Sequence, residues 1–227
     1  MGAAVRAAGV WVTAMTVLFA SCLLAGCTSG QEKRGEMTGT SDVEALVDCV
    51  DDARAGEAVA PVSAPEGLRD ALEQAAKAHA GTYAVACASA DGSWSVDVNG
   101  DEPFVSASII KLAILGTLLD QAQSGVLSLD DSVTVGPSDV VGGTGVIQAS
   151  GAGGSYTYRQ LAAYMIQDSD NIATNLIIDA VGMPAANEYA SEIGLTQTVL
   201  NRRMMDFSTD VENYTSANDV ARMLQLI

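Results

Sequence analysis

The most strongly patterned part of the chain is its beginning, where an apolar run over residues 7–24 follows one basic residue, Arg6. The run ends in the tetrapeptide Leu-Ala-Gly-Cys, whose last residue is Cys27. This pattern predicts a lipoprotein-type signal peptide over residues 1–26 and lipid attachment at Cys27. A transmembrane anchor is the alternative, because the run is almost long enough to span a bilayer. The weak positive flank and the specific ending favour the lipoprotein.

Polar positions dominate the next stretch, residues 27–64, which we predict to be a flexible acidic tether. Its first part, up to Ser41, is rich in Gly, Ser and Thr, as linkers are. Its second part is acidic and rich in Ala and Val, and has little capacity to form packed structure. One domain of ordinary size, residues 65–227, remains.

Within that domain, apolar spacing predicts one helix, two strands and then further helices. The helix expected at 108–120 is apolar nearly all round, and such a helix is buried at the centre of a domain. Asp91-Gly92 lies between the two strands and favours a hairpin turn. The other expected elements are a helix at 66–80, strands at 83–89 and 94–98, and helices at 157–167, 172–180, 184–193 and from Thr215 onward.

The last of these helices has no stop signal. Its apolar positions, Val220, Met223, Leu224 and Ile227, continue to the final residue without a Gly, an Asn or a polar tail. Two strands are also few for a sheet, because an isolated hairpin is marginal in water. We therefore expect that the chain is cut short and that C-terminal strands are missing.

The charge balance excludes some classes of partner. The chain has 11 basic and 28 acidic residues, a formal net charge of −17, which argues against nucleic acid or anionic lipid as a partner. Cysteines are few, and only Cys49 and Cys87 remain after the leader and the lipid site. Outside the cytoplasm these two could pair. Two separate thiols, with Cys87 a small core residue of a strand, are no less favoured.

Several kinds of catalytic site are excluded by the residues present. His79 is the only histidine, so a Ser-His-Asp triad would depend on it alone, and its place in a helix favours a surface residue. The chain has no G-x-S-x-G, no H-E-x-x-H and no Gly-rich loop ending in Lys-Ser or Lys-Thr. One histidine and two thiols are too few for a metal site, and no cofactor is expected.

The strongest candidate chemistry lies at the start of the buried helix, in Ser108-Ile109-Ile110-Lys111. Ser108 and Lys111 are three residues apart on one helix face, and Ser108 falls in the first turn, where free N–H groups favour a developing anion. A lysine that snorkels to the surface is the alternative. In a helix apolar on every side, however, a buried charge is costly. Burial also lowers a lysine pKa, which suits a proton acceptor.

A second motif, Ser169-Asp170-Asn171, precedes the helix expected at 172–180. Alone, it indicates a turn between helices with Asp or Ser as N-cap. Together the two motifs resemble those of the class A β-lactamase and penicillin-binding serine enzymes. The resemblance covers residues 66–227 and rests on Phe104-x-x-x-Ser108-x-x-Lys111, Gly142-Gly143-Thr144-Gly145, Ser169-Asp170-Asn171-x-Ala173-x-Asn175-Leu176 and Thr215-Ser216-Ala217, in this order.

The resemblance implies a mixed α/β (α+β) fold, in which an antiparallel sheet flanked by helices lies beside a mostly helical lobe, with Ser108 between them. It also implies a role for each matching residue. Ser108 would be the acylated nucleophile and Lys111 a proton acceptor. Ser169 would relay a proton to the leaving nitrogen. Asn171 would bind the substrate amide and contact Lys111, and Asp170 would be structural, tying the turn together.

Two features depart from the family pattern. The third family motif, Lys-Thr-Gly or Lys-Ser-Gly on an inner strand, is absent from the chain. That strand would hold the substrate carboxylate and donate half of the oxyanion hole. The loop glutamate that activates the deacylating water is also absent, because Met204 and Met205 follow Arg202-Arg203. Asp206 is the nearest acid and a possible substitute base.

The expected function is serine acyl transfer, with an acyl-enzyme formed from β-lactams or D-alanyl peptides and then hydrolysed. One alternative is a penicillin-binding protein or D,D-carboxypeptidase with slow deacylation. A non-catalytic cell-envelope binding lipoprotein, or a gene fragment, is another. We expect a monomer outside the cytoplasm, attached to the bacterial cell membrane through the lipid on Cys27.

Overall fold

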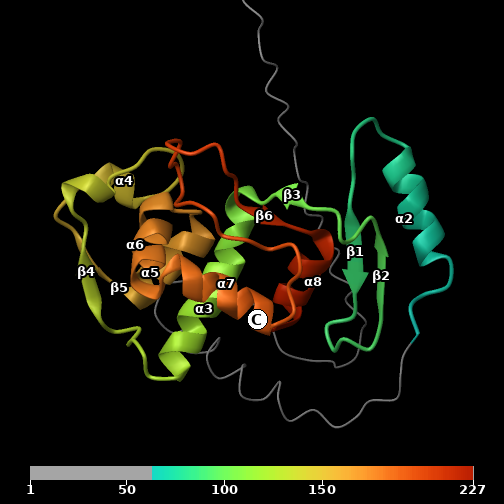
Figure 1. The fold of residues 1–227 in the computed structure, drawn as a ribbon, viewed down its shortest axis with the longest axis horizontal. Helices are drawn as coiled ribbons and strands as arrows, with labels where there is room; N and C mark the ends of the chain where they lie inside the picture. The colour runs from blue at the N-terminus through green and yellow to red at the C-terminus, as the bar shows by residue number, and fades with distance from the viewer. Residues whose placement is uncertain (1–62, 227) are drawn as a thin grey trace, which may run out of the picture. The chain divides into compact units, whose positions relative to one another are not determined.

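The computed structural model describes residues 63–226. The predicted signal peptide, the lipid site Cys27, the tether up to residue 62 and Cys49 lie outside the described residues. Figure 1 shows the order of helices and strands in the described part. None of the helices in this part is long and apolar enough to cross a bilayer.

The centre of the fold is helix α3 (Lys111–Gln123), which packs against four other helices (Figure 1). Its apolar residues Ile114 and Leu118 are fully buried, as expected for a helix that is apolar on every side. The four neighbours are α5 (Tyr158–Gln167), α6 (Asn171–Val181), α7 (Met183–Glu192) and α8 (Ala217–Leu226). All five correspond to helices predicted from the apolar spacing, with ends that differ by a few residues.

The start of the central helix differs from the prediction. Residues Ala107–Ile110 form a 3-10 turn, η1, and the α-helical pattern begins only at Lys111. Ser108 therefore lies in a tighter turn, in which hydrogen bonds join residues three apart. The helix also continues beyond the predicted end at residue 120 to Gln123, and Gly125 follows with a positive φ of 74°.

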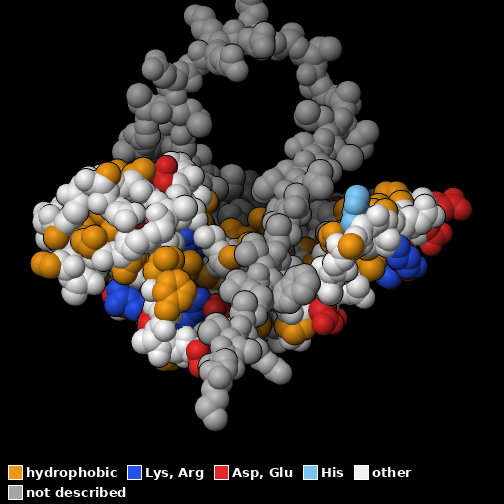
Figure 2. All heavy atoms as spheres, turned by 90° about the horizontal axis from the view of Figure 1, so that it is seen from above, with side chains coloured by type: hydrophobic (Ala, Val, Ile, Leu, Met, Phe, Trp, Pro, Cys, Tyr) orange, Lys and Arg blue, Asp and Glu red, His pale blue; other side chains and the backbone are white. Residues whose placement is uncertain are grey.

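The first described helix, α2 (Leu68–Lys77), is shorter than predicted and contains no buried residue. Gly67 precedes it with φ 76°, a conformation that glycine adopts at low cost. His79 lies just beyond its end and is exposed, and Figure 2 shows the chain's single histidine, in pale blue, at the surface. The prediction that His79 is a surface residue is confirmed.

The strands form three antiparallel pairs. The predicted hairpin joins β1 (Val85–Ala88) to β2 (Ser95–Val98), with Val85 opposite Val98. Two further pairs were not predicted: β3 (Phe104–Val105) with β6 (Tyr214–Thr215), and β4 (Ser132–Thr134) with β5 (Ser155–Thr157). Strands of two or three residues are too short to show an alternating pattern. Two short helices, η2 (Pro137–Asp139) and α4 (Ile147–Ser150), complete the described elements.

The predicted α+β class is confirmed, with antiparallel strands beside a helical lobe (Figure 1). The core of that lobe is a cluster of buried aliphatic and methionine side chains, most of them from α3, α5, α6, α7 and α8. Burial of this apolar surface supplies the main free energy of folding. The cluster also fixes the N-terminal ends of α3 and α6, where the candidate residues lie.

Candidate active site

Ser108 lies at an exposed end of the central helix, directly after a strained residue. Ala107 has a positive φ of 45°, which is unfavourable for a residue with a side chain. Strand β3 precedes this turn, and Ser106 N donates to Asn213 O at 2.8 Å. Because Ser108 is in the first turn, its backbone N–H has no acceptor within the helix. The fold thus presents both the hydroxyl and this N–H of Ser108 to a substrate.

Lys111 is buried, with 2% of its surface exposed, and its ammonium group is held by three acceptors. Lys111 Nζ donates to Ser169 O at 2.7 Å, to Ser169 Oγ at 2.9 Å and to Asn171 Oδ1 at 3.1 Å. Burial lowers the pKa of Lys111 to about 8, and the nearby carboxylate of Asp170 acts in the opposite direction. This lysine is therefore much easier to deprotonate than an ordinary surface lysine.

Ser169 connects the lysine to the candidate nucleophile. Its Oγ accepts from Lys111 Nζ and donates to Ser108 Oγ, both at 2.9 Å. Sequence spacing alone suggested that Ser108 and Lys111 touch across one helix turn. The structure shows that the hydrogen-bonded connection runs through Ser169. Ser169 has a positive φ of 51°, so a second strained residue lies at this site.

Asp170 fixes the turn that carries Ser169 and Asn171. It is fully buried and caps α6, because its Oδ1 accepts from Ala173 N at 2.9 Å. Its Oδ2 accepts from Ile147 N at 2.8 Å and so ties α4 to the same turn. A Cβ on Gly145 would collide with this carboxylate, which explains a glycine there. The structural function implied for Asp170 matches these contacts.

One wall of the site is backbone from the Gly142-Gly143-Thr144-Gly145 segment. Asn171 Nδ2 donates to Gly142 O at 3.2 Å, and Asn171 N donates to Thr144 O at 3.0 Å. Thr144 Oγ1 donates to Ser169 O at 2.8 Å. Gly143, with φ 95°, lies so close to Asn171 that a Cβ would collide with its Nδ2. The segment therefore fixes the orientation of the Asn171 amide.

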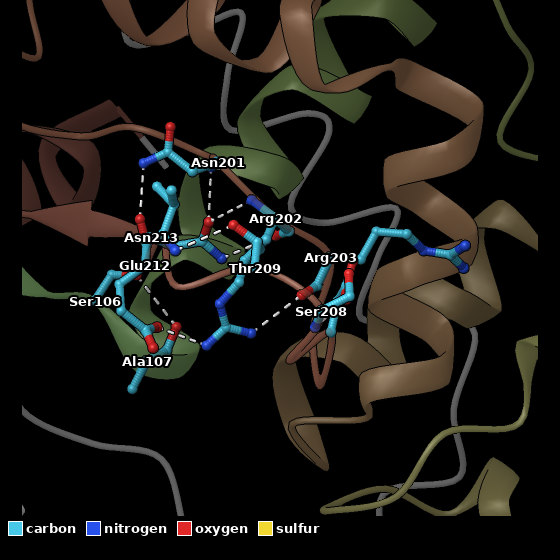
Figure 3. Close-up of polar contacts among 11 residues, drawn as sticks. Ser106, Ala107, Asn201, Arg202, Arg203, Ser208, Thr209, Glu212 and Asn213 are labelled. Atoms are coloured by element: carbon cyan, nitrogen blue, oxygen red, sulfur yellow. Dashed lines mark hydrogen bonds and ion pairs between the residues drawn. The ribbon is translucent and has the colours of Figure 1, made fainter.

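A loop over residues 201–213 lies next to this wall and is closed at its base. Arg202 Nη2 and Glu212 Oε2 form an ion pair at 2.6 Å (Figure 3). Asn213 Oδ1 accepts from Asn201 N at 2.7 Å and from Arg202 N at 2.9 Å, and Asn213 Nδ2 donates to Arg202 O at 3.0 Å. Asn213 also accepts from Ser106, so the base of the loop is attached to the segment that leads to the nucleophile.

The two methionines of this loop face different surroundings. Asn175 holds the backbone of Met204 on both sides, through Asn175 Nδ2 to Met204 O at 3.0 Å and Met204 N to Asn175 Oδ1 at 2.8 Å. The Met204 side chain packs against the core. Met205 has a positive φ of 61°. A Cβ added to Gly143 would lie 3.3 Å from the Met205 sulfur and would also meet Asn171 Nδ2. The Met205 side chain and the Asn171 amide therefore both lie beside Gly143.

The structure does not join Asp206 to the other candidate residues. Its Oδ1 accepts from Ser208 N at 3.0 Å and from Ser208 Oγ at 2.6 Å. These hydrogen bonds, from the Ser208 hydroxyl and backbone, lower the pKa of Asp206. A carboxylate that is stabilised in its charged form is a weaker base. Asp206 therefore closes its own turn and is a poor substitute for the family's glutamate.

Two positioning residues were given no role from the sequence: Asn175, which appears there only as part of the second motif, and Asn213. Asn175 lies among apolar residues of α6 and is 1% exposed, and Asn213 is 5% exposed. A buried amide in an apolar helix needs partners, so Asn175 carried a usable signal. Asn213 carried none, because its partners are backbone groups of a loop that has no regular pattern. Among residues 63–226, no group of three side chains of metal-binding type gathers into a cluster.

Comparisons with known proteins identify the family of the chain. The Beta-lactamase enzyme family matches residues 67–227. The extended-spectrum β-lactamase PER-1 of Pseudomonas aeruginosa is 30% identical over 70% of this chain and 54% of its own length. A β-lactamase structure from Sphaerobacter thermophilus has a TM-score of 0.64 at 30% identity, covering 71% of this chain and 62% of that one.

A variant of PBP-A, solved as an acyl-enzyme complex with penicillin G, has a TM-score of 0.64 at 28% identity, covering 73% of this chain and 62% of that one. The chain spans about half the length of the curated relatives it matches. The family match includes both serine motifs and the loop of residues 201–213. From these motifs, this fold and these matches, the chain belongs to the Beta-lactamase enzyme family.

Proposed function

We propose that this protein is a serine enzyme that forms an ester between Ser108 and a β-lactam or a D-alanyl peptide. The observation that carries the proposal is the series from Lys111 Nζ through Ser169 Oγ to Ser108 Oγ, with both links at 2.9 Å. A buried amine connected to an exposed hydroxyl is what base-assisted attack requires. The acyl-enzyme of PBP-A with penicillin G supports the substrate class. Because Lys111, Ser169 and Ser108 all come from one chain, we propose a monomer.

In the proposed acylation, Lys111 is neutral and both hydrogen bonds run in the reverse direction, so that Ser108 donates to Ser169 and Ser169 donates to Lys111. Lys111 then takes the proton of Ser169 Oγ, and Ser169 takes the proton of Ser108 Oγ. Ser108 Oγ then bonds to the substrate carbonyl carbon, and the backbone N–H of Ser108 donates to the developing oxyanion. When the carbon–nitrogen bond breaks, Lys111 returns its proton through Ser169 to the leaving nitrogen. Lys111 ends neutral and Ser108 carries the acyl group, so protons and charges balance.

Asn171 supplies the binding contact in this proposal. Its Oδ1 is occupied by Lys111, and one hydrogen of its Nδ2 is donated to Gly142 O. An amide nitrogen has two hydrogens, so the second remains for a carbonyl group of the substrate. Asn171 belongs to the same turn as Ser169, and Ser169 is hydrogen-bonded to Ser108. A substrate whose amide binds Asn171 therefore has its reactive carbonyl near Ser108.

A penicillin-binding protein with slow release of its acyl group is the second candidate function. It is favoured by Met204 and Met205, which stand in the loop where class A enzymes have a glutamate. It is also favoured by the turn in which Asp206 binds Ser208. The proposed acylation is common to both candidates, and only the fate of the ester differs.

We expect the rate of acylation to rise with pH and to level off above about 8. Below its pKa of about 8, Lys111 already carries the proton that it must accept. At pH 7 only about a tenth of the molecules have a neutral Lys111, given that value. The measurement is the initial rate of labelling by a fluorescent penicillin across the pH range in which the protein stays folded.

The Lys111→Met variant is the control for this prediction. It keeps an unbranched side chain that is only one atom shorter, and it removes the amine. Labelling should slow by about 10²–10⁴-fold, the usual contribution of general acid–base catalysis, and the inflection should disappear. A flat profile in the unaltered protein, or an inflection that persists in Lys111→Met, would exclude Lys111 as the base.

We also propose an extracytoplasmic, membrane-anchored location, which rests on the Leu-Ala-Gly-Cys ending of the leader. Replacing Cys27 by serine should release the protein from membranes or leave an uncleaved precursor, because the lipid is attached to the thiol. Cys22→Ser is the matched control, since this leader cysteine lies outside the cleavage motif. Incorporation of radiolabelled lipid that is unchanged in Cys27→Ser would contradict the prediction.

A further inference from the structure

One face of α6 carries three polar residues at four-residue spacing, Asn171, Asn175 and Asp179. Residues four apart on a helix are neighbours on its surface. Three consecutive residues of the 201–213 loop meet this face in the reverse order. Met205 lies with the Asn171 amide beside Gly143, Met204 is held by Asn175, and Arg203 pairs with Asp179 at 3.0 Å.

The last of these three contacts is much more exposed than the middle one. The hydrogen bonds between Asn175 and Met204 come from an amide that is 1% exposed. The Arg203 and Asp179 side chains are 34% and 46% exposed. Arg203 Nε is buried without a hydrogen-bond partner, so the carboxylate of Asp179 is the charged group that compensates this guanidinium. Figure 3 shows the Arg203 side chain pointing away from the Arg202–Glu212 pair, toward a neighbouring helix.

We propose that the Arg203–Asp179 ion pair is a clamp that positions Met204 and Met205 against the active site. The part of this inference that concerns the acyl-enzyme rests on the proposed function. An apolar methionine beside Asn171 keeps water away from an ester on Ser108, and exclusion of water slows hydrolysis. When the clamp opens, the loop moves more freely, water reaches the ester, and the acyl group is released sooner. Arg203 and Asp179 are positioning residues, since neither touches the reacting atoms.

The surroundings of Asp179 make the clamp sensitive to pH. Burial raises the pKa of Asp179, Arg203 on the loop lowers it, and Asp139 on η2 raises it. Protonated Asp179 no longer balances the charge of Arg203. Because the pKa of Asp179 is raised, the ion pair with Arg203 is lost at a higher pH than a pair with an ordinary carboxyl group would be. Acyl-enzyme lifetime is therefore expected to shorten as the pH falls through this range.

The first test measures the loop without any substrate. Amide hydrogen exchange of residues 203–206 is compared in the unaltered protein, in Asp179→Asn and in Asp130→Asn. The last variant removes the acid from an exposed ion pair with Arg159, 3.3 Å long, on another part of the fold. Asp179→Asn should exchange about two- to fivefold faster in the loop, the effect of losing a partly exposed ion pair. Asp130→Asn should be unchanged. Equal exchange in all three proteins would overturn the clamp, whether or not Ser108 is acylated.

The second test measures the lifetime of the penicillin adduct by intact-protein mass spectrometry. Asp179→Asn should lose the adduct about two- to fivefold faster, with an unchanged rate of labelling. Asp139→Asn should shift the pH dependence of lifetime to lower pH, because a like charge next to Asp179 is removed. A merely structural defect would lower labelling and lifetime together and would overturn the clamp. If the unaltered protein forms no adduct, the proposed function fails, and the exchange experiment still decides the clamp.

Discussion

Replacement of Ser108 by alanine is expected to abolish covalent labelling by a fluorescent penicillin, whereas the unaltered protein should be labelled once per molecule. The Ser108 hydroxyl is the one that is both exposed and connected through Ser169 to a buried amine. An alanine has no atom that can bond to the substrate carbonyl carbon. Fluorescence of the denatured protein after electrophoresis, with intact mass, measures the adduct directly. The experiment should use the whole protein that the natural gene encodes.

Ser155→Ala is a matched control for this experiment. Ser155 is also an exposed serine, but it lies on strand β5, and its Oγ makes only a long 3.5 Å contact with Val133 O. Its variant should be labelled like the unaltered protein. Labelling that survives in Ser108→Ala would identify another nucleophile. Absence of labelling in the unaltered protein would favour the alternative of a non-catalytic binding protein.

The sequence was most informative where a charged side chain interrupts or precedes the apolar pattern of a helix. Lys111 is the only charged residue between Ser108 and Leu119 in the apolar central helix, and this isolation predicted a buried, chemically active amine. Ser169 and Asp170 precede a strongly apolar helix, and this position predicted that one of them is the N-cap, which in the structure is Asp170. Both inferences depend on residues close together in the chain.

The connection between Ser108 and Lys111 could not be predicted in this way. It depends on Ser169, which is far away in the sequence and reaches the site through a strained backbone with φ 51°. Ala107 and Met205 also adopt positive φ values, of 45° and 61°. Neither residue type favours this conformation, so no local preference indicates it. Tertiary contacts impose these conformations, and the three residues all lie around the candidate site.

The same reason explains why the shape of the 201–213 loop was not foreseen. Its ends are fixed by Asn213, whose side chain binds backbone groups of Asn201 and Arg202. Its middle is fixed by Asn175, from a helix that is distant in sequence. Two methionines in a row gave no indication that one packs against the core while the other lies beside Gly143.

That loop leads to the prediction with the second large effect, which concerns turnover. We expect a burst of one β-lactam per enzyme, followed by little further hydrolysis. Acylation needs the lysine and the two serines, which the structure brings together. Release of the ester needs a base for water, and a methionine can neither accept a proton nor orient a water strongly. Loss of general-base assistance slows release by about 10²–10⁴-fold. The measurement is the time course of nitrocefin hydrolysis, once with the enzyme concentration equal to that of the substrate and once with a small fraction of it.

The loop variants decide what limits release. Met204→Glu is expected to speed it little, because the Met204 side chain packs against the core and a carboxylate there would lack both water and the correct direction. Met205→Glu is the comparison, since that side chain lies beside Gly143 and the Asn171 amide, and it should speed release more. Steady hydrolysis by the unaltered protein at about 1–10³ s⁻¹, typical of enzymes, would contradict the burst. If Asp206→Asn then abolished that turnover, Asp206 would be the substitute base after all, and its turn with Ser208 would have to open during catalysis.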